Sequence, residues 1–360
     1  MNPVERVIRR VDATQQRYTP TAFVFGVVKK YGDDNGGVLA SNLAYSAFVS
    51  VFPLLLILTT ILGLVAAVNA TVRTDVLNAV SGQVPLIGKT LTGNVHELKR
   101  SSIIGLIVGL LGLIWGASGL AQAGLFTMEQ VWNLPGPARP GYVQRMGRAA
   151  LFIGLLGAGV IVTTGLASLN TYGLKGFWWV ILAEALAAAF NVGMYIGAFR
   201  VLTPKGVPTH ALIPGAITGG ILWTVLQVLG TYLVHHFLHS DSLYGIFGTV
   251  LGLLAWIYLA VQVTVYCAEI NVVLARRLWP RSIVQPPLTE ADRASMALQA
   301  LQNQRRPEQH VAVTFDDREP DANTPAGTPQ TPDEVAPPAD ARVPEPRDAA
   351  DPSSASDLAK

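Results

Sequence analysis

Seven polar side chains lie inside stretches of the chain that otherwise contain almost only apolar residues. They are Asn42, Tyr45, Glu184, Asn191, Tyr195, Gln262 and Glu269. A carboxylate in the apolar part of a membrane helix costs roughly 3 kcal/mol on insertion scales. Such a cost is tolerated where the group meets water, a partner or a substrate, so these positions are candidates for lining a substrate path.

Helical spacing places these side chains in stripes. At 100° per residue, Glu184, Asn191 and Tyr195 lie within about 40° of one another. Gln262 and Glu269 share a similar stripe farther along the chain. The two carboxylates differ by roughly 25–30 Å in depth at a rise of 1.5 Å per residue, so they cannot form a catalytic pair. A path lined at several depths fits this spacing better than one compact catalytic site.

Two uses of these residues remain open. In the first, the five uncharged residues line a path and Glu184 and Glu269 act at its two ends. In the second, the polar groups hydrogen-bond between helices and only fix their packing. Glu269 would then cap the inner end of its helix against Arg276 or Arg277.

Other chemistry has weaker support in the sequence. His235 and His239 share a helix face and are suited to a metal ion, but histidines at a helix end are more often interfacial. Cys267 is interpreted as a small apolar packing residue. The chain has no phosphate-binding loop, and its basic residues are not interleaved with aromatic ones. We therefore predict no enzymatic activity, no cofactor, no metal ion and no nucleic-acid partner.

The elements that hold these residues are predicted to be membrane helices. Half of the 360 residues are hydrophobic and only 14% are charged, whereas soluble domains carry about a quarter charged residues. A bilayer core requires about 20 apolar residues per helix. Six such runs are present, at 38–68, 103–125, 149–169, 178–199, 211–234 and 243–272. The predicted fold is an all-α, polytopic membrane protein with about six transmembrane helices.

Lys and Arg predict the orientation of these helices. They gather before the first run, in the second and fourth connections, and after the last run. Examples are Arg9, Lys30, Arg145, Arg200 and Arg276. Because cytoplasmic loops carry the excess of Lys and Arg, both termini are expected in the cytoplasm of a bacterial inner membrane.

Three segments follow from this pattern. Residues 1–37 are expected to be cytoplasmic and interfacial, with no signal peptide and with Lys29 and Lys30 near lipid headgroups. A cytoplasmic extension of the first span is the alternative for Phe23–Tyr31. Residues 38–280 form the transmembrane domain. Residues 281–360 are an acidic tail rich in Pro and Ala, with a short helix at 288–304 and disorder beyond about 310.

Small residues and prolines predict how the spans pack. Gly109 stands four residues after Gly105, and Gly116 four after Gly112, which lines small residues on one helix face and lets helices approach closely. Pro53 and Pro214 fall inside the first and fifth runs. Each is expected to remove a helical hydrogen bond and kink its helix.

Two segments resemble a known family. Ser41–Leu64, reading SNLAYSAFVSVFPLLLILTTILGL, is similar to the first span of the YihY/BrkB family of bacterial membrane proteins. Gly215–Asn271 is also similar, ending in CAEIN where the family usually has Gly-Ala-Glu-Leu-Asn. Cys267 and Ile270 depart from that ending, whereas Glu269 and Asn271 match it. The resemblance covers about residues 20–280.

The resemblance implies a membrane protein without agreed catalytic residues. Members once carried the label of ribonuclease BN, a label regarded as an error, and some are suspected of moving lipids or envelope precursors. The expected function is a transporter that uses no ATP, or a protein that handles a lipid-like or envelope-precursor substrate, with membrane lipids as partners. A structural or assembly factor of the envelope is the alternative, and a membrane-bound ribonuclease is the remote one.

Overall fold

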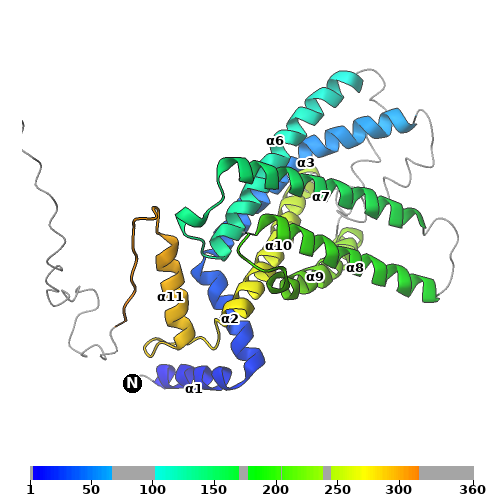
Figure 1. Ribbon diagram of the computed structural model, residues 1–360. Coiled ribbons are helices and arrows are strands. Elements are labelled where there is room, and N and C mark those ends of the chain that lie inside the picture. The colour runs from blue at the N-terminus through cyan, green and yellow to red at the C-terminus, as the bar shows by residue number, and fades with distance from the viewer. Residues whose placement is uncertain (1–2, 67–101, 170–176, 204, 238–244, 316–360) are drawn as a thin grey trace, which may run out of the picture. The chain divides into compact units, whose positions relative to one another are not determined.

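The computed structural model describes residues 3–66, 102–169, 177–203, 205–237 and 245–315. All regular secondary structure in these ranges is helical, and Met1–Phe315 form one compact unit (Figure 1). The α-helices are α1 (Pro3–Arg17), α2 (Thr19–Asp33), α3 (Gly36–Ala66), α6 (Ser102–Val131), α7 (Tyr142–Leu169), α8 (Phe177–Leu202), α9 (Ile213–Phe237), α10 (Gly245–Arg276) and α11 (Glu290–Gln302).

Six of these helices, α3 and α6–α10, are long and apolar enough to cross a membrane, which confirms the predicted fold class. Large apolar side chains such as Ile161 and Val228 are exposed on them. That surface suits a lipid solvent, because water would not tolerate so much apolar area. Some helices extend beyond the predicted apolar runs. Helix α7 already begins at Tyr142, so Arg145 and Arg148 lie in its first two turns rather than in the preceding connection.

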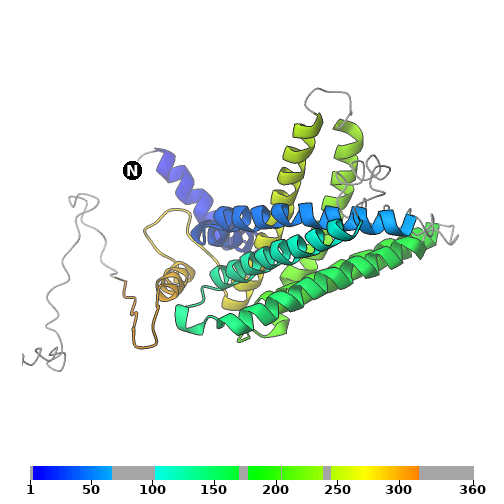
Figure 2. The same cartoon turned by 90° about the horizontal axis from the view of Figure 1, so that it is seen from above.

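Glycines allow α3 and α6, the described helix pair with the most extensive contact, to approach each other. The two helices lie side by side in both views (Figures 1 and 2). A Cβ atom added at Gly116 would lie 3.0 Å from Ser50 Cα, and one at Gly109 would lie 2.9 Å from the Ile57 side chain. The glycine spacing that predicted close packing therefore serves this contact.

Helix α9 begins in a way that the sequence prediction missed. It starts at Ile213, so Pro214 occupies the first turn, where its missing N–H would have had no helical partner. The expectation that Pro214 removes a helical hydrogen bond was wrong for this reason. The next residue, Gly215, donates its backbone N–H to the buried side chain of Asn271, with 2.7 Å between N and Oδ1. Helix α10 thus caps the start of α9.

The N-terminal helices and the segment after α10 pack together into a cap, which we define as α1, α2 and residues 278–302. Asp292, fully buried, joins its parts: its Oδ1 lies 2.5 Å from Arg281 Nε and 2.9 Å from Lys29 Nζ. Arg281 also pairs with Asp33, at 2.7 Å. The short helix expected at 288–304 is present as α11, and a capping box at Thr289 begins it.

Hydrogen bonds keep two carboxylates of the cap, Asp292 and Asp12, ionised. Burial pushes the pKa of Asp292 upward, but bonds from Arg281, Lys29, the Ser282 backbone and Thr289 outweigh that effect and hold it well below its usual range. Asp12 behaves in the same way, because bonds from neighbouring side chains and a backbone N–H lower its pKa despite burial. Both groups are therefore charged at neutral pH.

Both lysines of α2 have partners within the protein, and the burial of Lys30 corrects the predicted headgroup contact for that residue. Lys29 pairs with Asp292, and the side chain of Lys30 is fully buried. Helix α2 is also separate from α3, because the chain turns at Asn35, which has a φ of 55°. Helix α2 is therefore a separate helix packed against α10, which corrects the predicted extension of the first span, whereas its position at the membrane interface stays a prediction.

Candidate functional site: a membrane cavity and a buried ion cluster

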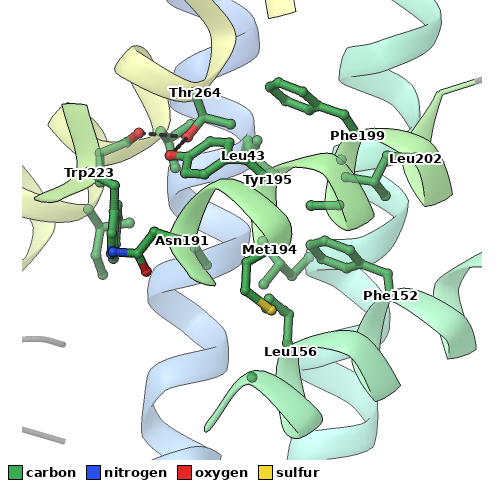
Figure 3. A pocket seen from close by; sticks show the side chains of 18 of the residues that line it. Leu43, Phe152, Leu156, Asn191, Met194, Tyr195, Phe199, Leu202, Trp223 and Thr264 are labelled. Atoms are coloured by element: carbon green, nitrogen blue, oxygen red, sulfur yellow. Dashed lines mark hydrogen bonds between the residues drawn. The ribbon is translucent and has the colours of Figure 1, made fainter. Parts of the chain in front are cut away.

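A cavity of about 440 Å³ lies among the six membrane helices (Figure 3). Each of the six helices contributes to its wall, which consists of glycines and mostly apolar side chains. One from each, in chain order, is Leu43, Gly124, Phe152, Phe199, Trp223 and Trp256. Binding sites for small molecules have this size and this apolar character.

A few polar groups enter the apolar wall. The Tyr195 hydroxyl lies 3.0 Å from Thr264 Oγ1, joining α8 to α10, as Figure 3 shows. Asn191 Nδ2 donates to Thr224 Oγ1 at 3.3 Å, joining α8 to α9. Thr163 on α7 and the indole N–H groups of Trp223 and Trp256 complete the polar set of the wall. In ligand-binding sites, a few polar groups of this kind fix the orientation of the ligand, and an apolar wall contacts the apolar part of the ligand.

The structure brings together two of the predicted site residues and separates others. Asn191 and Tyr195 line the cavity from one stripe of α8. Gln262 is half-buried on α10 and is not among the residues lining this cavity. The side chain of Glu184 lies outside those that the structure describes, as do those of His235 and His239.

Asn42 and Tyr45 do not face the cavity, which corrects their prediction as inward-facing residues. Both are exposed, Tyr45 with 67% of its surface accessible. Helix α3 turns Leu43 and Ala47 toward the cavity instead. Tyr45 is two residues from each of them, and therefore points about 200° away around the helix.

Glu269 lies in a buried ion cluster with Lys30 and Asp34. Its Oε2 is 3.6 Å from Lys30 Nζ, and both side chains are fully buried. Lys30 also pairs with Asp34 and donates to the Val131 carbonyl at 3.2 Å. Neither oxygen of Glu269 accepts a hydrogen bond within the described part of the chain, so the charge of Lys30 is its principal compensation.

This partnership differs from the predicted cap of Glu269 against Arg276 or Arg277, while its role at one end of a substrate path stays a prediction. Arg276, one of the two arginines expected to pair with it, donates to the Trp132 carbonyl at 3.1 Å. The partner is a lysine 239 positions earlier in the chain. Lys30 follows an apolar stretch and ends a basic pair, which suggested a headgroup contact, and no feature of the sequence linked it to Glu269.

Comparisons with known proteins identify a family of membrane proteins. Residues 27–289 match a protein family described as virulence factor BrkB. The inner membrane protein YhjD of Escherichia coli (strain K12) is 24% identical over 274 residues, covering 70% of this chain and 81% of that protein. A UPF0761 membrane protein of Psychrobacter sp. (strain PRwf-1) is 24% identical, covering 70% of this chain and 48% of that protein.

A relative from Bacillus subtilis (strain 168), YfkH, is named as a ribonuclease-like protein and is 20% identical over 269 residues, covering 71% of this chain and 96% of that protein. No solved structure matches the chain. The match to the family spans the six membrane helices, the second half of α2 and the ion cluster.

Proposed function

The chain belongs to the virulence factor BrkB family of membrane proteins, and from that premise we propose that its six-helix bundle binds a lipid-like molecule in the cavity. The occupant is a membrane lipid or an envelope precursor with an apolar chain. The protein handles or moves this molecule without ATP. The observation that carries the proposal is the 440 Å³ cavity, whose wall is apolar and is built by all six helices.

The composition of the wall supports an apolar occupant. Side chains such as Phe152, Phe199 and Trp256 offer dispersion contacts along most of the cavity. Burial of each methylene group of a ligand contributes about 0.8 kcal/mol. Polar side-chain groups among the lining residues are few, and too few for a sugar or a peptide. They are those of Thr163, Asn191, Tyr195, Thr264 and the indole N–H groups of Trp223 and Trp256.

We place both termini of the chain in the cytoplasm. The cap joins α1 and α2 to residues 278–302 through the contacts of Lys29 and Arg281, so the segments before α3 and after α10 lie on one side of the bundle. The excess of Lys and Arg on that side favours the cytoplasm. We expect alkaline phosphatase fused after residue 285 to be inactive, and strong activity would contradict this orientation.

A structural or assembly role is the second candidate, and one observation favours it. Tyr195 and Asn191, the clearest polar groups of the cavity, already hydrogen-bond to other helices. In that role the polar contacts fix helix packing and the cavity holds no specific ligand. The two candidates therefore differ in whether the purified protein retains a lipid.

Filling the cavity tests the lipid-binding proposal. Ala198 lines the cavity from α8, and we expect Ala198→Trp to weaken lipid binding by at least about tenfold, because displacing even two methylene groups costs that much. Native mass spectrometry of protein released from gentle detergent measures the lipid adduct. Ala189→Trp on the same helix is the matched control, because Ala189 is exposed and does not line the cavity.

The outcomes separate the two candidate functions. Lipid binding predicts an adduct on the wild-type protein and on Ala189→Trp, with most of it lost from Ala198→Trp. Equal adducts on all three proteins would place the lipid on the outer surface and would support the structural role.

A further inference from the structure

One face of α7 continues from the cavity wall to a pair of arginines. Phe152 and Leu156 line the cavity at helical spacing. Arg148 precedes Phe152 by four residues and Arg145 precedes it by seven, so all four side chains share one face of the helix. A molecule lying along this face would meet an apolar wall first and guanidinium groups at its end.

A third arginine joins this pair. Arg148 Nη1 donates to the Thr203 carbonyl at 3.2 Å, and Arg200 is a neighbouring charge of the same sign. Arg145 Nε donates to Gln122 Oε1 at 3.2 Å. We call Arg145, Arg148 and Arg200 the arginine cluster. These bonds use few of the five N–H donors that each guanidinium carries.

The arginine cluster has more positive charge than its protein neighbours neutralise. Glu129 is the carboxylate beside it, buried and 3.5 Å from Arg145 Nη1. Arg139 is a further positive charge that interacts with Glu129, so the positive groups outnumber this carboxylate. Like charges held together at the edge of a membrane favour an anion between them, and guanidinium groups match phosphate oxygens in pairs.

The cavity and the arginine cluster adjoin through the chain itself. Met128 lines the cavity and the next residue is Glu129. Leu202 lines it as well, and the next residue is Thr203, whose carbonyl accepts from Arg148. The end of α6 lies on the side of the bundle that carries the cap, because Lys30 of α2 donates to the carbonyl of Val131, the last residue of α6. Both places where the cavity adjoins the arginine cluster lie on this side.

We propose that the occupant of the cavity is an anionic lipid whose phosphate group binds the arginine cluster. This inference rests on the proposed lipid-binding function and names its substrate class. The apolar chain lies against Phe152 and Leu156, and the headgroup lies at the cap side of the membrane. Arg148 is the central contact, because it stands one turn from the cavity wall and beside Arg200.

Two lipids with identical chains test this inference. Dioleoylphosphatidic acid carries a phosphate, and dioleoylglycerol does not. Binding of each to the purified full-length protein is measured by native mass spectrometric titration. We expect the wild-type protein to prefer the phosphatidic acid by at least about 25-fold, because each of two arginines contributes about fivefold. The double change Arg148→Gln and Arg200→Gln is expected to weaken the binding of phosphatidic acid by about fivefold for each arginine, or about 25-fold together. The binding of dioleoylglycerol is expected to stay unchanged.

Two further double variants separate phosphate binding from a general effect of charge or folding. Arg148→Lys with Arg200→Lys retains the positive charge and is expected to retain most of the preference for phosphate. Arg305→Gln with Arg306→Gln removes two exposed arginines outside the cluster and is expected to change nothing. If Arg148→Gln with Arg200→Gln weakened the binding of both lipids equally, the arginines would only support the fold and the inference would be wrong.

The remaining outcomes distinguish this inference from the function on which it rests. Equal binding of the two lipids by the wild-type protein would overturn the headgroup assignment while leaving lipid binding intact. Binding of neither lipid would overturn the proposed function itself. Displacement of phosphatidic acid by inorganic phosphate alone, at equal concentration, would show an anion site to which the cavity contributes nothing, and would also contradict the inference.

Discussion

Replacing Lys30 with Met is expected to remove most of the folded protein from the membrane. The side chain of Lys30 is fully buried and is the shared cation of Asp34 and Glu269. Without it, two carboxylates remain buried with no opposite charge at that position. Breaking a buried ion pair by removing one partner costs about 3–5 kcal/mol, which is a large part of the total stability of a typical domain.

The amount of monodisperse protein after detergent extraction, together with its melting temperature, measures this effect. Lys205→Met is the matched control, because Lys205 is exposed and carries the same charge. Combining Lys30→Met with Asp34→Asn and Glu269→Gln removes the uncompensated charges and is expected to restore much of the yield. Wild-type yield and melting for Lys30→Met alone would show that the ion cluster does not hold α2 to α10.

Adding a single methyl group at Gly215 is expected to be nearly as damaging. A Cβ atom there would lie 2.0 Å from the Cys267 carbonyl oxygen and 2.6 Å from the Asn271 side-chain amide. The backbone oxygen has no room to rotate away, so α9 must move from α10 and lose the bond to Asn271. We expect Gly215→Ala to cost about 3 kcal/mol or more, at the upper end of the range for overpacking.

Thermal unfolding in detergent measures this cost. Gly193→Ala provides the control, because Gly193 is also in a membrane helix but a Cβ atom added there would meet only open space. The control is expected to melt as the wild-type protein does. Equal melting of Gly215→Ala and Gly193→Ala would contradict the close approach of α9 to α10.

Features within one helix could be predicted from the sequence. Apolar runs long enough for a bilayer indicated the six membrane helices. The spacing of Asn191 and Tyr195 placed them on one stripe, and the structure places both in the cavity. Such features depend only on helix geometry and on the cost of polar groups in lipid, and both can be evaluated from neighbouring residues.

Which helices meet, and through which side chains, could not be predicted. A helical stripe gives the angle between Tyr45 and its neighbours but not the side on which other helices lie, and Tyr45 is exposed. Lys30 and Glu269 are distant in the chain and meet only because α2 docks on α10. The role of Pro214 depended on the residue at which α9 begins.

The structure also gives a physical reason for the end of the segment that resembles the family. Within Cys267–Asn271, Glu269 pairs with Lys30 of the cap, and Asn271 caps the start of α9. The Cys267 carbonyl leaves room only for glycine at position 215. These contacts hold the helices around the cavity.

The native mass spectrum of the wild-type protein decides whether the cavity holds a lipid. The protein is extracted in gentle detergent, and the mass of each species is compared with the mass of the chain alone. We predict one lipid adduct that persists through delipidating washes and is lost from Ala198→Trp. A wild-type protein that occurs only at the mass of its own chain, while still folded by its melting curve, would contradict the proposed lipid binding.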